Sequence, residues 1–162
     1  MNDTKYCVKE INYLNSDDNR KMNSICRFWF SEPKTLNLTS PSMTYPFQFK
    51  KWAEFYQKND ANVFSYTVQK DEWIVGHGSI KIKKNVGHIF HIIIDPNYRR
   101  KGLASKLINE LRKKGGDKGV KIFTLNVDKK NLAAFYLYEK LGFLKDKNIS
   151  KNTVRMKTIL YA

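Results

Sequence analysis

Residues 88–143 read HIFHIIIDPNYRRKGLASKLINELRKKGGDKGVKIFTLNVDKKNLAAFYLYEKLGF, and this stretch decides the fold. It starts with a nearly continuous apolar run at residues 89–94, passes through Asp95-Pro96 and a cationic turn at residues 99–102, and becomes an amphipathic helix near Leu103. The N-terminus of a helix presents free backbone N–H groups and the positive end of the helix dipole, and cationic side chains strengthen the same field. Strand, basic turn and helix together therefore predict a phosphate-binding turn.

The residues after this turn predict a crossover between two parallel strands. The helix keeps apolar residues at helical spacing and is predicted to end near Gly115-Gly116. A buried strand follows at residues 120–127, and a strand, a helix and a strand in this order indicate a parallel pair with a right-handed crossover. Asn131 is then expected to cap a further helix, which Gly142 ends.

The residues before the stretch predict one strand, two helices and a meander of antiparallel strands. Ser16 is a candidate N-cap for the first helix because Asp17 and Asp18 follow it, and prolines among Thr, Ser and Asn mark a loop between the helices. Aromatic residues flank that loop; we expect most of them to pack against the core, while some could line an acceptor pocket. The predicted elements are a strand at residues 6–11, a helix at 17–30, a loop at 31–46, a helix at 47–56, strands at 63–69, 73–83 and 86–94, and a last strand at 154–160.

The chain is strongly basic. Its formal net charge of +15 comes from 30 Lys and Arg against 15 Asp and Glu, which favours a polyanionic partner such as nucleic acid, a ribosome or a phosphorylated cofactor. The lysines are spread along the whole chain, and Arg, the better groove reader, supplies only six of the cations. We therefore favour general basic character over a dedicated nucleic-acid site.

Length and cysteine content narrow the class further. At 162 residues the chain suits one domain with a core of its own. Cys7 and Cys26 show neither a CxxC spacing nor a nearby histidine pair, so neither a metal site nor a disulfide framework is predicted. No apolar run approaches the roughly 20 residues that span a bilayer, and the N-terminal residues lack the apolar core of a signal peptide. We expect a cytoplasmic protein with reduced thiols and no membrane segment.

Two motifs in the opening stretch match those of a known family. The run RRKGLA at residues 99–104 fits the pattern R/Q-x-x-G-x-G/A, and Asn131, Ala134, Tyr138 and Gly142-Phe143 fit the spacing N-x-x-A-x-x-x-Y-x-x-x-G-F. Either motif alone is weak, but both at this separation resemble the GNAT superfamily of N-acetyltransferases. The style of the motifs is closest to the ribosomal-protein-alanine N-acetyltransferases.

The resemblance implies a fold and a co-substrate. The expected fold is a single α/β domain over residues 1–162, with a mixed, mostly antiparallel sheet of about seven strands, about four flanking helices and a splayed parallel strand pair at the cofactor site. Acetyl-CoA would place its pyrophosphate on the backbone N–H groups of the basic turn and its pantetheine arm along the preceding strand, with the N–H of Ile92 facing the thioester oxygen. The expected cofactor-binding residues are Ile92, Ile93, Ile94, Arg99, Arg100, Lys101, Gly102, Leu103, Ala104, Ser105, Asn131 and Tyr138.

The resemblance also implies candidate catalytic residues. Tyr138 occupies the family's usual general-acid position, from which a phenol would protonate the departing CoA thiolate. Tyr136 lies on a different helix face and is expected to pack. The family's catalytic glutamate falls at Asn126, which cannot take a proton. His88 matches a position at which serotonin N-acetyltransferase has a catalytic histidine, and an imidazole suits the role of general base.

Other candidates for the base stay open. A lone strand histidine is more often structural than catalytic, so Asp128 or a chain of waters could take the proton instead. His91 is expected on the face of the strand opposite to His88, since the two are three residues apart.

Three functions remain at this point. We favour an N-acetyltransferase that delivers acetyl from acetyl-CoA directly to a primary amine of a small molecule, or of a protein N-terminus or lysine. A non-catalytic acyl-CoA-binding or sensing module would explain Asn126, and a nucleic-acid- or ribosome-binding domain would explain the charge. A homodimer is common in the family, and the sequence leaves the oligomeric state open.

The acceptor is expected to bind at residues 28–55 and 145–158. Glu32 and Glu54 are the only acidic residues in the first of these regions. An acceptor site for aminoglycosides or polyamines usually carries carboxylates, so a peptide N-terminus or a small amine with an acidic tail fits this sequence better.

Overall fold

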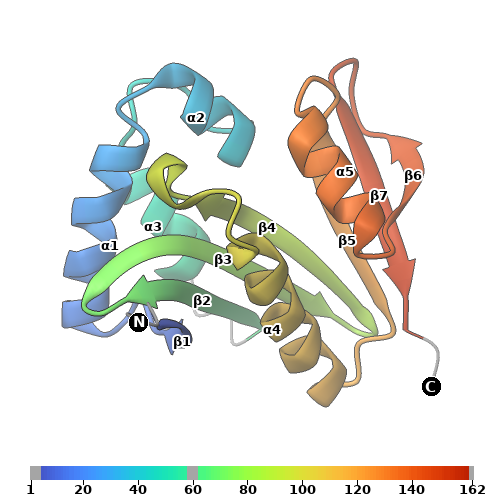
Figure 1. Cartoon of the computed structure of the whole chain (residues 1–162), viewed down its shortest axis with the longest axis horizontal. Coiled ribbons are helices and arrows are strands. Elements are labelled where there is room, and N and C mark those ends of the chain that lie inside the picture. Colours follow the sequence, from blue (N-terminus) through green and yellow to red (C-terminus); the bar gives the residue numbers. More distant parts are fainter. Residues whose placement is uncertain (1–4, 58–61, 161–162) are drawn as a thin grey trace.

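The structure is a computed structural model that describes residues 5–57 and 62–160 (Figure 1). These residues form one α/β domain in which a seven-stranded sheet carries helices on both faces. The elements in chain order are β1 (Tyr6–Ile11), α1 (Ser16–Trp29), α2 (Pro33–Thr39), α3 (Phe49–Gln57), β2 (Val63–Lys70), β3 (Trp73–Lys83), β4 (Val86–Ile94), the 3-10 turn η1 (Pro96–Tyr98), α4 (Leu103–Asp117), β5 (Ile122–Asp128), α5 (Leu132–Lys140), β6 (Leu144–Asn148) and β7 (Thr153–Ile159).

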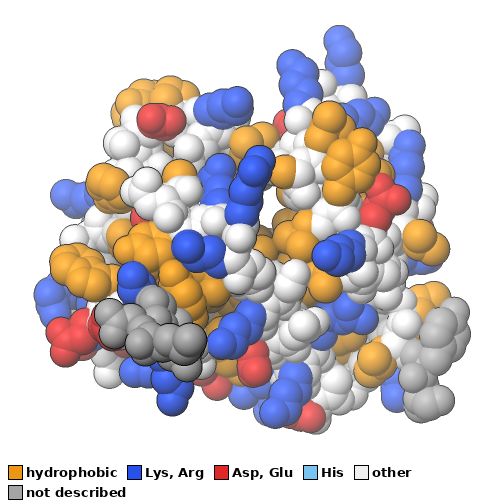
Figure 2. Space-filling view, viewed as in Figure 1, with side chains coloured by type: hydrophobic (Ala, Val, Ile, Leu, Met, Phe, Trp, Pro, Cys, Tyr) orange, Lys and Arg blue, Asp and Glu red, His pale blue; other side chains and the backbone are white. Residues whose placement is uncertain are grey.

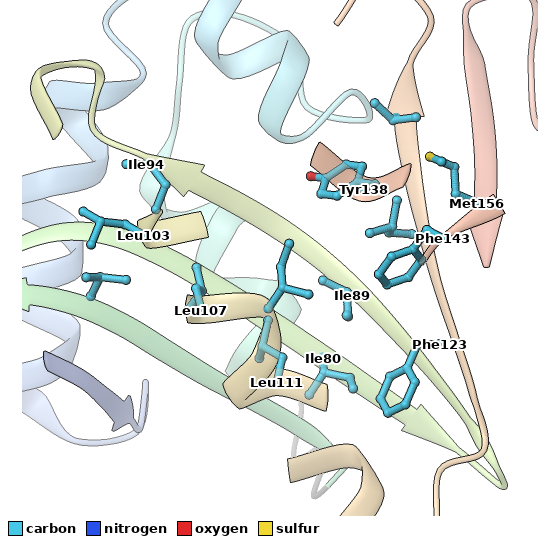
Figure 3. Close-up of a cluster of buried hydrophobic side chains, with 14 of the residues drawn as sticks. Ile80, Ile89, Ile94, Leu103, Leu107, Leu111, Phe123, Tyr138, Phe143 and Met156 are labelled. Carbon is cyan, nitrogen blue, oxygen red and sulfur yellow. The ribbon is translucent and has the colours of Figure 1, made fainter. Parts of the chain in front are cut away.

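The sheet has the strand order β1-β2-β3-β4-β5-β7-β6. Among the described strands only the pair β4–β5 is parallel, which confirms the mixed, mostly antiparallel sheet with a crossover through α4. One apolar cluster joins the sheet to α4 and α5 (Figure 3), and a second joins the other face to α1, α2 and α3. Helices therefore flank the sheet as predicted, on both of its faces.

The parallel pair separates half-way along its length. Register pairing runs from Val86 opposite Ile122 to Ile89 opposite Leu125, and no further pair between β4 and β5 forms among the described residues. Both strands nevertheless continue, to Ile94 and Asp128. Figure 1 shows the two strands diverging, with α4 and α5 on either side of the gap. The expected splay is confirmed, and it leaves one backbone edge of β4 without a partner strand.

Several predicted boundaries were wrong for identifiable reasons. The N-cap of α1 is Asn15 rather than Ser16, because the Asn15 side chain accepts hydrogen bonds from the N–H groups of Asp17 and Asp18. The predicted loop at residues 31–46 contains α2, since Pro33 at the first helical position is compatible with a helix and merely looked like a breaker. The short exposed strand β6 was not predicted, because its five residues show no apolar alternation.

The end of α4 was also misplaced. The helix continues through Gly115 and Gly116 to Asp117, and the left-handed residue that follows it is Gly119, with φ +87°. Gly115 is required for contact rather than for capping. A Cβ atom there would lie 2.6 Å from Cε1 of Phe123, so the helix lies too close to this ring of β5 for a side chain to be added without a shift.

Candidate active site

The basic turn has the backbone geometry of an anion site. Gly102 is the N-cap of α4, has φ +73° and contributes no side-chain cap, and Arg100 before it also has positive φ. The first helical hydrogen bond runs from Lys106 N to Gly102 O at 3.1 Å. The N–H groups of the first helical residues therefore have no acceptor within the helix, and they point toward the turn with the positive end of the dipole.

Three hydrogen bonds fix the turn relative to the end of β4 and to α1. The Nε of Arg99 donates to the carbonyl oxygen of Ile94 at 3.3 Å. Asp95 is buried and accepts two hydrogen bonds, from Asn97 N at 2.9 Å and from Nε1 of Trp29 on α1 at 3.0 Å. The hydrogen bonds of Asp95 thus fix the position at which β4 ends and the turn begins. In Figure 2, Lys and Arg side chains border the indentation between the α4 and α5 halves of the molecule.

The three isoleucines at the end of β4 use their side chains for the core. Ile92 and Ile94 pack in the cluster with α4, and Ile93 packs in the cluster with α1 and α3. Their side chains alternate between the two faces, so only their backbone groups face the gap between β4 and β5. A ligand in the gap would be bound by main-chain atoms.

Tyr138 projects from α5 toward this gap. Its side chain is 8% exposed and lies against the apolar cluster, and Figure 3 shows its hydroxyl oxygen on the side that faces β4. Burial raises the pKa of Tyr138 to about 12. Asn131 caps α5 as predicted, with its Oδ1 accepting from Ala134 N at 3.3 Å. Tyr136, expected to pack, is 63% exposed because its helix face points away from the sheet.

The base candidates His88 and Asp128 lie on one face of the sheet, which Thr124 and Asn126 share. Nδ1 of His88 lies 2.8 Å from Oγ1 of Thr124, and burial, followed by the positive charge of Arg155, lowers the pKa of His88 to about 4. Asn126 accepts a hydrogen bond from Nε of Arg155 at 3.2 Å. Asp128 accepts from Lys130 N at 2.8 Å.

His91 does not lie on the face opposite to His88, contrary to the prediction. The β3–β4 register shifts between His77 and Ser79, so β4 carries one extra residue there, and His91 has φ +53°. This bulge turns the His91 ring into the cluster beneath α3, where it stacks on Trp52 at a centroid distance of 3.9 Å. The bulge lies within the splayed part of β4, two residues beyond the last pair with β5.

A buried hydrogen-bonded network surrounds the bulge, and sequence reasoning missed it. Nδ1 of His77 lies 2.9 Å from the carbonyl oxygen of His91, so this nitrogen carries a proton and donates. Nε2 of neutral His77 then accepts from the Tyr13 hydroxyl at 2.9 Å, and Tyr13 accepts from Nε1 of Trp52 at 2.9 Å. Burial lowers the pKa of His77 to about 4, which agrees with a neutral ring.

The His91 ring is held at both nitrogens. Nδ1 lies 2.7 Å from the Tyr56 hydroxyl and Nε2 lies 3.0 Å from Oγ of Ser40, at the end of α2. The Tyr56 hydroxyl also forms a hydrogen bond with Oγ of Ser79 at 2.9 Å. Elements from three distant parts of the sequence thus hold the bulge, and no local pattern signals it.

The aromatic residues around the predicted loop differ in burial, and their expected role in an acceptor pocket stays a prediction. Trp29 and Phe30 are buried, whereas Phe28 is 64% exposed. Phe47 and Phe49 contribute to a surface pocket of about 660 Å³ between α1 and α3. This pocket lies away from the gap between β4 and β5.

Residues 30–143 match the family model described as Acetyltransferase (GNAT) family. The chain belongs to the GNAT acetyltransferase family. Among relatives, an N-alpha-acetyltransferase from Saccharolobus solfataricus is 33% identical over 125 residues, covering 70% of this chain and 73% of that protein. A ribosomal-protein-alanine N-acetyltransferase from Salmonella typhimurium is 28% identical over 94 residues, covering 57% of this chain and 64% of that enzyme.

Solved structures of GNAT proteins share the fold. The PaiA N-acetyltransferase from Thermoplasma acidophilum, in complex with coenzyme A, superposes with a TM-score of 0.73 at 16% identity, covering 96% of this chain and 99% of that one. The match to an uncharacterised N-acetyltransferase of Methanocaldococcus jannaschii covers 54% of that protein, and the Salmonella match covers 64% of that enzyme. The chain thus spans less than two thirds of these relatives.

Two further findings concern the described part of this GNAT chain. No helix in residues 5–57 and 62–160 combines the length and apolarity needed to cross a bilayer. Over the same residues, no three His, Cys, Asp or Glu side chains come together as a metal site would require.

Proposed function

We propose that this chain is an N-acetyltransferase that moves acetyl from acetyl-CoA directly to a primary amine, and that residues 1–162 form its one domain. The observation that carries the proposal is the splay of β4 from β5 directly before a left-handed glycine turn. An unpaired strand edge can bind an amide-containing arm, and the helix N-terminus beyond it can bind a pyrophosphate. The acetyltransferase activities of the named relatives support the same reaction class.

The cofactor residues proposed here each have a physical role. The N–H groups of Leu103, Ala104 and Ser105 bind the pyrophosphate, since they lack helical acceptors. The charges of Arg99, Arg100 and Lys101 attract it. The backbone of Ile92, Ile93 and Ile94 pairs with the pantetheine arm, and Asn131, the N-cap of α5, binds the same arm.

The transfer requires a neutral amine and a protonated leaving group. The amine nitrogen attacks the thioester carbonyl, the C–N bond forms, and the C–S bond breaks to release the CoA thiolate. Tyr138, with a pKa of about 12, is protonated at neutral pH and donates its proton to sulfur. The N–H of Ile92 stabilises the oxygen of the tetrahedral intermediate.

His88 is the proposed base. This role requires the tautomer in which Nδ1–H donates to Thr124, so that the lone pair of Nε2 accepts the amine proton. With a pKa of about 4 the ring is neutral at pH 7 but weakly basic. Asp128, on the same face, is the alternative.

Thermal unfolding and CoA release test the proposal together. Saturating acetyl-CoA should raise the melting temperature, because a ligand that binds only the folded state stabilises it. With a turned-over amine, Tyr138→Phe should lower kcat by about 10² or more. Tyr136→Phe, on the same helix but exposed, is the matched control and should leave kcat unchanged. No thermal shift at millimolar acetyl-CoA, in a folded sample, would rule the proposal out.

A binding module without turnover is the second candidate, favoured by the amide at Asn126 and the low pKa of His88. It predicts an acetyl-CoA thermal shift with no CoA release for any amine.

We place either protein in the cytoplasm, because Cys7 and Cys26 are unpaired thiols. Ribosome or nucleic-acid contact would appear as salt-dependent retention on RNA, and a homodimer as a doubled mass in solution.

A further inference from the structure

We propose that the acceptor of this enzyme is a primary amine that also carries an anionic group, and that Arg155 binds this group. The inference rests on the proposed acetyl transfer and names the class of its second substrate. It is carried by where Arg155 stands and by what surrounds its charge.

Arg155 stands beside the point at which the strands separate. It lies on β7 directly opposite Asn126 of β5. Asn126 is the first residue of β5 beyond Leu125, the last one that pairs with β4. Side chains directly opposite each other on antiparallel strands share a face, so the guanidinium lies on the face of Thr124 and His88. The acetyl group would arrive at this same level of the sheet.

The charge of Arg155 is oriented but not neutralised. Its Nε donates to Oδ1 of Asn126, a neutral amide, at 3.2 Å. Within the part of the chain that the structure describes, no carboxylate forms an ion pair with it and no acceptor takes a hydrogen bond from its terminal nitrogens. Lys157, two residues along the same strand, differs in this respect, because its Nζ lies 3.3 Å from Oδ1 of Asp146.

The amide side chain of Asn126 explains why the positive charge of Arg155 is not neutralised. A glutamate at this position would face Arg155 directly and pair with it, which would cancel the positive charge. An amide holds the Nε edge of the guanidinium and leaves the edge with the two terminal nitrogens free. That edge matches the two oxygens of a carboxylate or a phosphate.

The neighbouring groups set where the two ends of the acceptor lie. His88, Thr124 and Asn126 contribute no negative charge beside Arg155, and the field of the guanidinium reaches His88. Asp128 is two residues beyond Asn126 on β5, so the two residues share a face and lie about 7 Å apart along the strand. The amine therefore lies at the gap, where His88 or, as the alternative, Asp128 accepts its proton, and the anionic group lies toward β7.

Carboxylates and phosphates offer the same paired oxygens, so both arms enter the test. CoA release is measured for matched amines: glycine against glycinamide, an Asp-Gly dipeptide against Asn-Gly, and glucosamine 6-phosphate against glucosamine. The basicity of the amine differs within a pair, but this difference is the same for every variant. The preference for the anionic member is therefore compared between wild type and Arg155→Gln.

The expected result is a preference of about tenfold or more in kcat/KM for the anionic member of at least one pair, lost in Arg155→Gln. Arg155→Lys, which keeps the charge but not the paired nitrogens, should retain part of it. Lys157→Gln is the matched control on the same strand and should keep the preference within about twofold. The arm that shows the effect identifies the anionic group.

Three outcomes would overturn the inference while leaving the acetyl transfer intact. They are equal or better turnover of the neutral amines, an anionic preference that survives Arg155→Gln, and a tenfold rise in the KM for acetyl-CoA in Arg155→Gln, which would assign Arg155 to the cofactor. Acetyl-CoA binding without CoA release from any amine would overturn the inference together with the proposed transfer, because it is the result expected of a binding module. A protein that shows neither a thermal shift with acetyl-CoA nor CoA release would instead fail the proposed function.

Discussion

The left-handed turn at Gly102 allows a prediction that separates backbone strain from contact. Gly102 has φ +73°, yet a Cβ atom built on it would meet no atom within 4 Å. In Gly102→Ala the whole effect therefore comes from the backbone. A non-glycine residue in this left-handed region costs about 1–2 kcal/mol of folding free energy. Alanine recovers about 0.4–1 kcal/mol of this cost, because its unfolded chain has less conformational entropy than that of glycine. The expected loss is about 1 kcal/mol in the free energy of unfolding.

Gly119 is the matched control for this substitution. It has φ +87° and equally open surroundings, but it follows α4 instead of preceding it. Urea unfolding should show the same loss of about 1 kcal/mol for Gly119→Ala, and thermal unfolding a fall of about 2–4 °C for either variant.

Acetyl-CoA affinity should distinguish the two variants. If the free turn relaxes in Gly102→Ala, the ligand must restore it, so affinity falls by up to about fivefold, the equivalent of 1 kcal/mol. Calorimetric titration should show no change for Gly119→Ala. Equal weakening in both variants would refute the assignment of the turn to the cofactor, and a stability loss above about 3 kcal/mol at Gly102 would refute the reasoning from strain.

Three further predictions concern stability. Gly115→Ala should lower the free energy of unfolding by about 1–3 kcal/mol in urea titrations, because its Cβ would lie 2.6 Å from the Phe123 ring; an unchanged midpoint would contradict this. Tyr13→Phe should cost about 1–3 kcal/mol, since Nε2 of buried His77 loses its donor, and a neutral result would count against the assigned tautomer. The pKa of His77 is about 4 in the folded state and near 6.5 in the unfolded chain, so the free energy of unfolding is highest above pH 6.5 and falls as the pH drops toward 4. His77 alone should lower it by about 2 kcal/mol between pH 7 and pH 5. A free energy of unfolding that stays constant from pH 7 to pH 5 would contradict the burial of His77 as a neutral ring.

Residues close together in the sequence were enough to predict the cofactor half of the site. The basic turn, the capping residue Asn131 and Tyr138 all lie within residues 88–143, where periodicity, caps and motif spacing are local properties. The turn and both motifs appear in the structure on the elements that were predicted for them. Their proposed contacts with acetyl-CoA stay predictions.

The surroundings of the proposed base could not be predicted from neighbouring residues in the sequence. His91 shares a side of β4 with His88 because of a bulge, and the partners of that bulge, Tyr13, Trp52 and Tyr56, come from distant elements. A single extra residue in a strand reverses the alternation of its side chains, and nothing in the local pattern marks it.

Local order in the sequence determined the class of fold, the basic turn before α4 and the position of Tyr138, because helix period, strand period and glycine conformation act over a few residues. Tertiary structure alone decided the surroundings of each charge. It buried His88 enough to lower its pKa, brought Arg155 of β7 opposite Asn126 of β5, and left that guanidinium without a counter-charge among the described residues. Pairing between strands that are 29 residues apart in the chain sets these distances. Electrostatic interactions follow such distances in space, so a sequence read alone cannot supply them.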